Sequence, residues 1–294
     1  MGDVHFWKVQ GTGNDFVLFE SSEVPDAVSD WARRLCHRRL GVGADGLLFV
    51  LPAQDDDASI RMRIFNVDGS EAEMCGNGLR CVALHGWARR GLPREFVVQT
   101  EAGLKSCFVM EGSEGDSGVV RISMGKPELD RSLIPVQGQG RCVAESMSVE
   151  GRSFAVTAVS IGNPHALVFV DSDEDLLELA RTFGPAFEHH RDFPMRTNVS
   201  FVRASGANQF DAVVWERGCG VTAACGTGAC AIGVAACLED RARPAVPLSI
   251  GLPGGTLRVQ VAADLSDVML EGPAEVSFAG FVDPDRLPEP RWMP

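Results

Sequence analysis

The sequence predicts an α/β chain of the α+β type with two pseudo-symmetric domains, each a mostly antiparallel sheet wrapped around a central helix. Three observations predict this fold. Many short segments alternate apolar and polar residues, which is the period of half-buried strands. Two apolar segments, residues 76–90 and 226–238, are long enough for buried helices. The landmarks of the first half also return in the second half.

The repeat is clearest around two cysteines. Residues 74–78 read Met-Cys-Gly-Asn-Gly and residues 224–228 read Ala-Cys-Gly-Thr-Gly, which places Cys75 and Cys225 at an offset of 150 residues (225 − 75). Other landmarks repeat at nearly the same offset: Gly13-Asn14 with Gly162-Asn163, and Asn66 with Glu216. An internal duplication is therefore predicted. If the two copies pack about a pseudo-twofold axis, Cys75 and Cys225 face each other across one cleft.

Each element follows from its local pattern. Strict alternation predicts strands at residues 60–64, 154–160 and 209–215, and paired strands around a glycine turn at 96–109 and 246–261. Amphipathic spacing predicts helices at residues 26–38 and 173–183. The segment 226–238 has hardly any polar face, and 76–90 resembles it except for its basic end. Each of these two helices is therefore expected at the centre of its half, with a cysteine at its N-terminus.

Composition limits the classes of function. The length of 294 residues suggests two domains, and the net charge of −13 disfavours a nucleic-acid partner, which selects clustered Lys and Arg. We find no apolar run of 18 residues and no apolar signal core at residues 1–10. The sequence therefore predicts no membrane span and a cytoplasmic location.

The nine cysteines are expected to be mostly reduced in that compartment. No C-x-x-C pair occurs and the six histidines lack metal-ligand spacing, so no metal site is predicted. Cys81, Cys230 and Cys237 lie in apolar helical segments, where cysteine usually acts as a small buried hydrophobe.

Cys75 and Cys225 differ from these because each precedes a glycine-rich helix start. The unpaired N–H groups and the positive dipole end of a helix favour a bound carboxylate and a thiolate. Glycines at these positions let a ligand approach the backbone. Two such helix starts could hold one carboxylate with a thiol on either side of the neighbouring carbon. That arrangement suits inversion at carbon, in which one thiol removes a proton and the other delivers one.

The chain resembles diaminopimelate epimerases over nearly its whole length. The resemblance rests on ordered blocks at residues 13–16, 41–47, 66–78, 162–165, 197–199, 215–218, 224–228 and 252–256. It implies a cofactor-independent isomerase that interconverts LL- and meso-diaminopimelate, in lysine and peptidoglycan precursor biosynthesis, and acts as a homodimer. It also implies a first domain of residues 1–119 completed by a returning strand within 275–294, and a second domain of residues 120–274.

The resemblance assigns roles to individual residues. The catalytic thiols would be Cys75 and Cys225, supported by His165 and Glu216. The α-carboxylate at the reacting carbon would be held by Gly76, Asn77, Gly226 and Thr227. The distal amino and carboxylate groups would be bound by Asn14, Asn66, Asn163, Asn198, Glu216 and Arg217. Three positions depart from the family pattern, namely Gly46, Cys219 and Val221, and they bear on fine specificity. Cys219 is expected to be a core residue.

Three other classes of protein fit the sequence less well. Proline racemase-like enzymes share the paired cysteines but resemble Met-Cys-Gly-His-Gly at the first site, where this chain has Asn77. Phenazine-biosynthesis-like isomerases lack the pair, and a non-catalytic amino-acid binding module would not need it. The G-x-G-x-x-G at 41–46 has a predicted helix before it and a strand after it, the reverse of a dinucleotide site. His189-His190, beside Glu188, Arg191 and Asp192, is predicted to form a solvated loop rather than a ligand pair.

Overall fold

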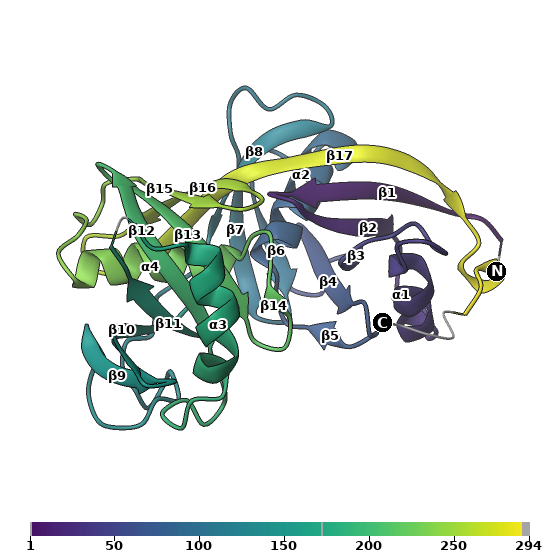
Figure 1. Cartoon of the computed structure of the whole chain (residues 1–294). Helices are drawn as coiled ribbons and strands as arrows, with labels where there is room; N and C mark the ends of the chain where they lie inside the picture. Colours follow the sequence, from purple (N-terminus) through teal and green to yellow (C-terminus); the bar gives the residue numbers. More distant parts are fainter. Residues whose placement is uncertain (1, 172, 290–294) are drawn as a thin grey trace. The chain divides into compact units, whose positions relative to one another are not determined.

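The computed structural model describes residues 2–171 and 173–289 and divides the chain into two compact units. Unit 1 comprises Met1–Ile122 with Gly272–Pro294, and unit 2 comprises Ser123–Glu271. Strands dominate both units, and the described residues contain four α-helices (Figure 1). The predicted mixed α/β class is confirmed.

Unit 1 is built from two helices and a set of short strands. Its strands are β1 (Val4–Gly11), β2 (Asn14–Glu20), β3 (Gly46–Leu51), β4 (Ile60–Asn66), β5 (Glu71–Ala72), β6 (Glu95–Thr100), β7 (Gly103–Val109) and β8 (Ser117–Ser123). Its helices are α1 (Val28–Cys36) and α2 (Gly76–Arg90), followed near the C-terminus by a 3-10 turn, η1 (Pro284–Arg286). The last strand, β17 (Val268–Val282), leaves unit 2 and pairs antiparallel with β1, from Gln10 opposite Glu275 to Val4 opposite Val282 (Figure 1).

Unit 2 has the same kinds of elements. Its strands are β9 (Glu145–Val149), β10 (Arg152–Ser160), β11 (Pro164–Phe169), β12 (Asn198–Gly206), β13 (Gln209–Glu216), β14 (Gly220–Val221), β15 (Leu248–Leu252) and β16 (Gly255–Val261). Its helices are α3 (Leu176–Glu188) and α4 (Gly226–Leu238). The alternating segments predicted as strands lie in β4, β10 and β13, and the paired runs form the hairpins β6–β7 and β15–β16.

The connectivity of unit 1 repeats in unit 2, which confirms the internal duplication. In unit 1, α1 connects the parallel pair β2 and β3, and α2 lies between the parallel pair β4 and β6. In unit 2, α3 connects β11 and β12, and α4 lies between β13 and β15, again with parallel pairing. The hairpin pairings are antiparallel in both units.

The two apolar helices have the bounds expected from the sequence. Both α2 and α4 begin directly after a cysteine. Helix α4 is buried at most of its positions, while α2 is buried from Gly76 to Gly86 and ends in Arg89 and Arg90. Helix α2 packs against β1, β2, β3, β4 and β7, and α4 against β10, β11, β12, β15 and β16. Gly233 lets α4 approach β16 closely, because a Cβ there would lie 2.7 Å from a methyl group of Val259.

The two amphipathic helices differ from their predicted bounds. Helix α1 is shorter than the predicted 26–38, since its cap is Ala27 and the chain is extended at His37. Helix α3 starts later and ends later than the predicted 173–183. The carboxylate of Asp175 caps it by accepting from Leu177 N and Glu178 N, and the helix continues through Pro185 to Glu188.

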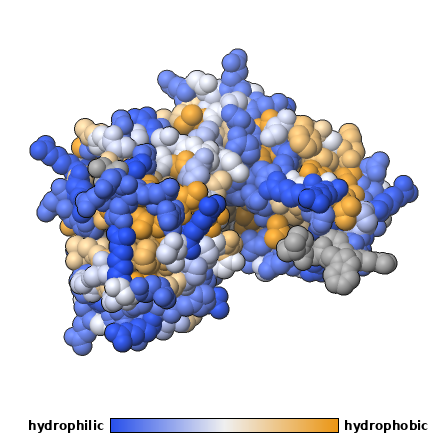
Figure 2. All heavy atoms as spheres, in the orientation of Figure 1, coloured by the Kyte–Doolittle hydropathy of each residue, from blue (hydrophilic) through white to orange (hydrophobic). Residues whose placement is uncertain are grey.

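Aromatic side chains join these helices to the strands of their own unit. In unit 1, Trp31 of α1 lies 5.8 Å from the Phe19 ring of β2, which stacks on Phe49 at 5.5 Å. In unit 2, Phe187 of α3 lies 5.3 Å from Phe154. None of the helices in the described ranges combines the length and hydropathy needed to cross a membrane. Figure 2 shows a largely hydrophilic visible surface with scattered hydrophobic areas.

Candidate active site

The first candidate thiol lies at the start of α2. Cys75 has an extended backbone, with φ −140° and ψ 119°, and its carbonyl accepts the first helical hydrogen bond from Leu79 N at 2.8 Å. Its side chain is half-buried. Gly76 follows at the first helical position and places no side chain there.

Two of the predicted substrate-binding asparagines contact each other beside Cys75. The Cys75 Sγ lies 3.7 Å from Asn14 Oδ1, within reach of an S–H donor. The same oxygen accepts a hydrogen bond from Asn77 Nδ2 at 3.2 Å. Asn77 is only 2% exposed, so this contact is shielded from water. Unit 1 therefore brings Asn14, Cys75 and Asn77 together.

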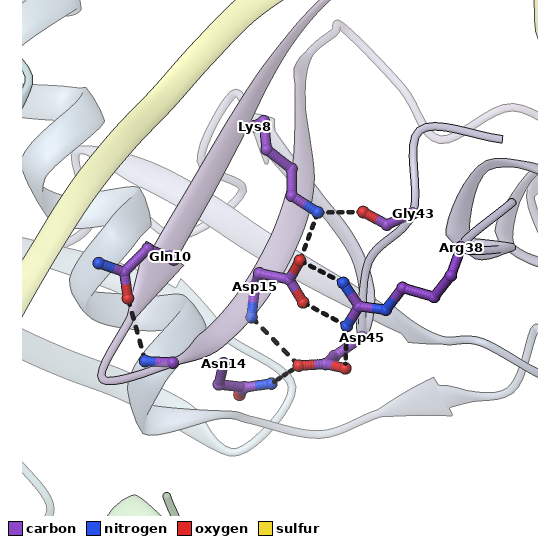
Figure 3. A network of polar contacts seen from close by, with 8 residues as sticks. Lys8, Gln10, Asn14, Asp15, Arg38, Gly43 and Asp45 are labelled. Carbon is purple, nitrogen blue, oxygen red and sulfur yellow. Dashed lines mark hydrogen bonds and ion pairs between the residues drawn. The ribbon is translucent and has the colours of Figure 1, made fainter. Parts of the chain in front are cut away.

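A network of charges lies behind Asn14 (Figure 3). Asn14 Nδ2 donates to Asp45 at 2.7 Å, and Arg38 donates to both Asp45 and Asp15. Lys8 also binds Asp15, at 2.5 Å. Burial alone would raise the pKa of Asp15, but the bonds from Arg38 and Lys8 outweigh it and lower that pKa to about 2. Sequence reasoning missed Asp45 and Arg38, although Asp45 lies in one of the family-like blocks.

Asn66 lies apart from this group of contacts. It ends β4 and donates from Nδ2 to Ser70 Oγ at 3.0 Å across the β4–β5 turn. Gly46 lies opposite Asn66 in the β3–β4 register. A Cβ at Gly46 would lie 2.7 Å from the carbonyl oxygen of Phe65, so this backbone excludes a longer side chain at that position. The departure from the family pattern at Gly46 thus fits a position where the backbone has no room for a side chain.

The second candidate thiol lies at the start of α4 and has different neighbours. Cys225 is 5% exposed, and its Sγ accepts from Gly228 N at 3.3 Å and lies 3.4 Å from Thr227 Oγ1. Burial, and next the negative charge of Glu216, raise the pKa of Cys225 well above its ordinary value. Gly226 again opens the helix without a side chain.

His165 is linked to this thiol through Thr227. Its Nε2 lies 2.9 Å from Asn163 Oδ1 and 3.1 Å from Thr227 Oγ1. The ring is fully buried. Burial, assisted by the charge of Arg217, lowers the pKa of His165 to about 3, so the ring is neutral at physiological pH. A neutral imidazole can exchange hydrogen bonds with Thr227 without placing a positive charge near Cys225.

Glu216 is a further neighbour of Cys225. It accepts a hydrogen bond from Thr222 Oγ1 at 2.5 Å. Burial raises the pKa of Glu216, and hydrogen bonds from Thr222 and Cys225 partly oppose that rise. The Cys225 thiol thus has a carboxylate as an acceptor and a backbone N–H as a donor.

The turn after β13 presents Arg217. Asn198 Oδ1 accepts from Arg217 N at 2.8 Å, and Asn198 Nδ2 donates to the carbonyl of Pro164 at 3.0 Å. The Arg217 guanidinium is exposed and donates to the carbonyl of Met195 at 2.9 Å. The backbone of this turn is therefore fixed by Asn198, while the charged end of Arg217 is accessible.

Glu188 corrects a prediction. It was expected in a solvated loop, but it is the last residue of α3 and is 4% exposed. Its carboxylate accepts from Trp215 Nε1 at 2.8 Å and from Gly218 N at 3.1 Å, so it also fixes the Arg217 turn. The prediction failed because the predicted helix stopped at residue 183, whereas α3 continues to Glu188. The apolar residues Phe183 and Phe187, four apart, indicate that the helix continues.

Cys219 is a second correction. It was expected in the core, but it is exposed in the turn between β13 and β14. Both flanking glycines have positive φ, 79° at Gly218 and 81° at Gly220, so the chain turns sharply here, and Cys219 lies on the surface of the turn. Val221 packs at the edge of the unit 2 core.

The helical cysteines follow their predicted burial in part. Cys81 and Cys230 are buried, and burial raises the pKa of Cys81 to about 12, while Cys237 is half-buried. Within residues 2–171 and 173–289, no group of three or more His, Cys, Asp or Glu residues is arranged to hold a metal ion.

Comparisons with known proteins agree with this arrangement. The family model described as diaminopimelate epimerase matches residues 6–129 and 157–276. A diaminopimelate epimerase of Desulforudis audaxviator is 47% identical over 94% of this chain and 98% of its own length. One of Synechococcus sp. is 45% identical over 94% of this chain and 96% of its own length.

A solved structure has the same fold at much lower identity. The crystal structure of a hydroxyproline epimerase from Agrobacterium vitis is 17% identical, has a TM-score of 0.67, and covers 95% of this chain and 91% of its own. Three observations indicate the same family: the cysteines at the N-cap positions of α2 and α4, the family model, and relatives at 45% identity or more. The chain belongs to the diaminopimelate epimerase family.

Proposed function

We propose that this chain interconverts LL- and meso-diaminopimelate by exchanging the proton on one α-carbon, with Cys75 and Cys225 as the two acid/base groups and no cofactor. The observation that supports this most is that each cysteine occupies the N-cap position of the equivalent helix of its unit, in a chain 47% identical to a diaminopimelate epimerase. One thiol removes the proton, and the other delivers a proton to the same carbon. The product would enter lysine and peptidoglycan precursor biosynthesis.

The helix starts are proposed to bind the α-carboxylate. The N–H groups at Gly76, Asn77, Gly226 and Thr227 lie in the first turns of α2 and α4, where backbone donors lack helical acceptors. A carboxylate held there lies at the positive ends of two helix dipoles. The same donors would stabilise the charge that develops when the α-proton leaves, which is necessary because an amino-acid α-hydrogen is far less acidic than a thiol.

The distal amino-acid head group needs charged and polar partners because burying an unpaired charge is costly. The exposed guanidinium of Arg217 can pair with the distal carboxylate in a forked geometry. Glu216 and four asparagines would complete the contacts with the distal head group. Two of the asparagines belong to unit 2, as Arg217 does, and two to unit 1, namely Asn163 and Asn198, and Asn14 and Asn66. Lysine lacks the distal carboxylate and should therefore be a poor substrate.

The polar neighbours of Cys225 are proposed to tune its protonation. Glu216 can receive the thiol proton, and the neutral ring of His165 can act through Thr227. A substrate that displaces water from this site would strengthen both interactions.

The two structural units are proposed to be the two epimerase domains, each with its sheet wrapped around α2 or α4. The packing of α2 against β1, β2, β3, β4 and β7, and the burial of α4, support that arrangement. We further propose a cytoplasmic homodimer. Phe278 and Phe281 of β17 are 50% and 72% exposed and supply apolar surface that a partner could cover. Sedimentation of the purified protein tests the dimer.

An assay in deuterium oxide tests the reaction. The purified protein, without added cofactor, should convert LL-diaminopimelate to the meso isomer and place one deuterium on the inverted α-carbon. Proline and lysine serve as comparison substrates. Binding of diaminopimelate without deuterium incorporation would indicate a non-catalytic binding module, and equally fast turnover of proline would favour a broader racemase.

A further inference from the structure

We infer that Asp45 is a positioning residue that turns the Asn14 amide so that its carbonyl oxygen accepts the hydrogen of the Cys75 thiol. Asp45 lies outside the residues assigned above to substrate binding or acid/base chemistry. The inference rests on the proposed function only in treating Cys75 as an acid/base group.

The direction of the Asn14 amide follows from the chemistry of its partners. An ionised carboxylate only accepts hydrogen bonds, so the group 2.7 Å from Asp45 Oδ2 must be the Asn14 amide nitrogen. The carbonyl oxygen of Asn14 then points the other way, 3.7 Å from Cys75 Sγ and 3.2 Å from Asn77 Nδ2. The Asn77 amide nitrogen donates to this same oxygen, which agrees with the orientation that Asp45 sets.

Asp45 is itself held in place by charge (Figure 3). Its second oxygen accepts from Arg38 at 2.7 Å, and Oδ2 also accepts from Asp15 N at 3.2 Å. Arg38 and Lys8 together balance the two carboxylates of Asp15 and Asp45. These hydrogen bonds and balanced charges hold the Asp45 carboxylate in one position. The carboxylate in turn fixes the orientation of the Asn14 amide.

The consequence for Cys75 concerns its proton. A carbonyl oxygen stabilises an S–H group by accepting its hydrogen, but it repels the negative charge of a thiolate. Cys75 therefore rests as a thiol, ready to deliver a proton. If the Asn14 amide were reversed, its N–H would face the sulfur and favour the thiolate instead.

The test replaces Asp45 with the isosteric amide, Asp45→Asn. The cation of Arg38 then selects the remaining carbonyl oxygen, which leaves the introduced NH2 facing Asn14 and favours reversal of the Asn14 amide. We expect alkylation of Cys75 by iodoacetamide at pH 7.5, followed by peptide mass spectrometry without substrate, to become about tenfold faster. The exposed Cys219 in the same digest reports the reagent and should be unchanged.

The matched control is Asp15→Asn. It removes the other carboxylate of the network and costs stability, but it leaves the bond between Asn14 and Asp45 intact. We expect Cys75 alkylation within twofold of the unmodified protein. Equal acceleration in both variants, or no acceleration in a folded Asp45→Asn protein, would overturn the inference.

A second variant covers the case in which Asp45→Asn does not fold. Asp45→Ala removes the acceptor without adding a donor and should accelerate Cys75 alkylation by a smaller factor, about threefold. A rate equal to that of the unmodified protein would again refute the positioning role. These rates need no turnover, so if the protein does not epimerise diaminopimelate, the proposed function fails while the positioning of Cys75 is still measured.

Discussion

The two helix starts share a backbone but not an electrostatic environment. Cys75 and Cys225 both cap a helix with an extended conformation, at φ −140° and φ −118°, and both are followed by glycine. Cys75 is half-buried beside the carbonyl oxygen of Asn14. Cys225 is almost fully buried and has a backbone N–H donor and a carboxylate neighbour. Duplication preserved the position of the thiol, and substitution of its neighbours made the two sites chemically different.

The equivalent positions around the thiols show how the sites diverged. Asn66 has a neutral side chain and is exposed. Its counterpart Glu216 has an ionisable carboxyl group, is half-buried and accepts a hydrogen bond from Thr222. In unit 1, Asn14 lies between the Asp45 carboxylate and the Cys75 thiol and contacts both. A pair of different thiols suits a reaction in which one group must accept a proton while the other supplies one.

Removing either thiol should have the largest effect on catalysis. Cys75→Ala and Cys225→Ala should each lower kcat by at least ~10²–10⁴, because general acid/base catalysis is worth that much. Steady-state epimerisation of LL-diaminopimelate measures the loss. Cys81→Ala in α2 and Cys237→Ala in α4 are the controls and should keep most activity. Near-normal epimerisation in either of the first two variants would show that one thiol suffices.

The next largest effect should come from Arg217, which only unit 2 supplies. Arg217→Met should depress kcat/KM for diaminopimelate by roughly 2–5 kcal/mol, by analogy with truncating one partner of a buried charge pair. Arg191→Met removes the same charge from a side chain that is 88% exposed and should be nearly neutral. Equal effects of the two substitutions would mean that Arg217 acts only through net charge.

Two groups with lowered pKa values, His165 of unit 2 and Asp15 of unit 1, should differ in their response to acid. His165 has a folded pKa of about 3 against an ordinary 6.5, so it contributes stability above pH 6.5 that is lost as pH falls towards 3. Asp15 has a folded pKa of about 2 against 3.8, so its contribution is lost only below pH 3.8. Burial also lowers the pKa of His85 in unit 1, so the part of the loss above pH 4 that belongs to His165 is measured with a His165 variant.

Urea unfolding at pH 7 and pH 5 measures this difference. At about 1.4 kcal/mol per pH unit below 6.5, the unmodified protein should lose about 2 kcal/mol more than His165→Gln over that range. His189→Gln, which changes an exposed histidine, should retain the pH dependence of the unmodified protein. If His165→Gln retains it as well, the ring is not held neutral by burial.

Most of the fold could be predicted from the sequence because hydrophobic periodicity and the glycine-containing motifs at element ends are local signals. The apolar runs 76–90 and 226–238 have the bounds of α2 and α4, and the alternating runs lie in strands. The repeated Cys-Gly-x-Gly likewise predicted both helix caps. These signals depend on neighbours along the chain, so they require no knowledge of tertiary contacts.

What sequence reasoning missed depends on contacts between distant segments. Asp45 acts on Asn14 across 31 residues, and Glu188 acts on Gly218 across 30. Neither residue has a local pattern that distinguishes it from a solvated acid. Cys219 was assigned to the core from the usual burial of cysteine, and the two flanking glycines with positive φ override that preference.

The smallest predicted effect tests how unit 2 fixes its distal binding turn. A glutamine at position 188 offers one oxygen to two donors, Trp215 Nε1 and Gly218 N, so Glu188→Gln leaves one N–H unpaired. We expect a loss of about 1 kcal/mol in kcat/KM, mainly through a higher KM, since the turn that bears Arg217 is loosened.

Trp215→Phe removes one of the two donors and keeps a ring beside Gly184. In that background the single oxygen of the glutamine can serve Gly218 alone, so Glu188→Gln should cost clearly less than it does in the unmodified protein. Kinetics and urea unfolding of the four proteins complete the cycle. Strictly additive effects would mean that Glu188 does not hold the two donors together, and the Arg217 turn would then depend on Asn198 instead.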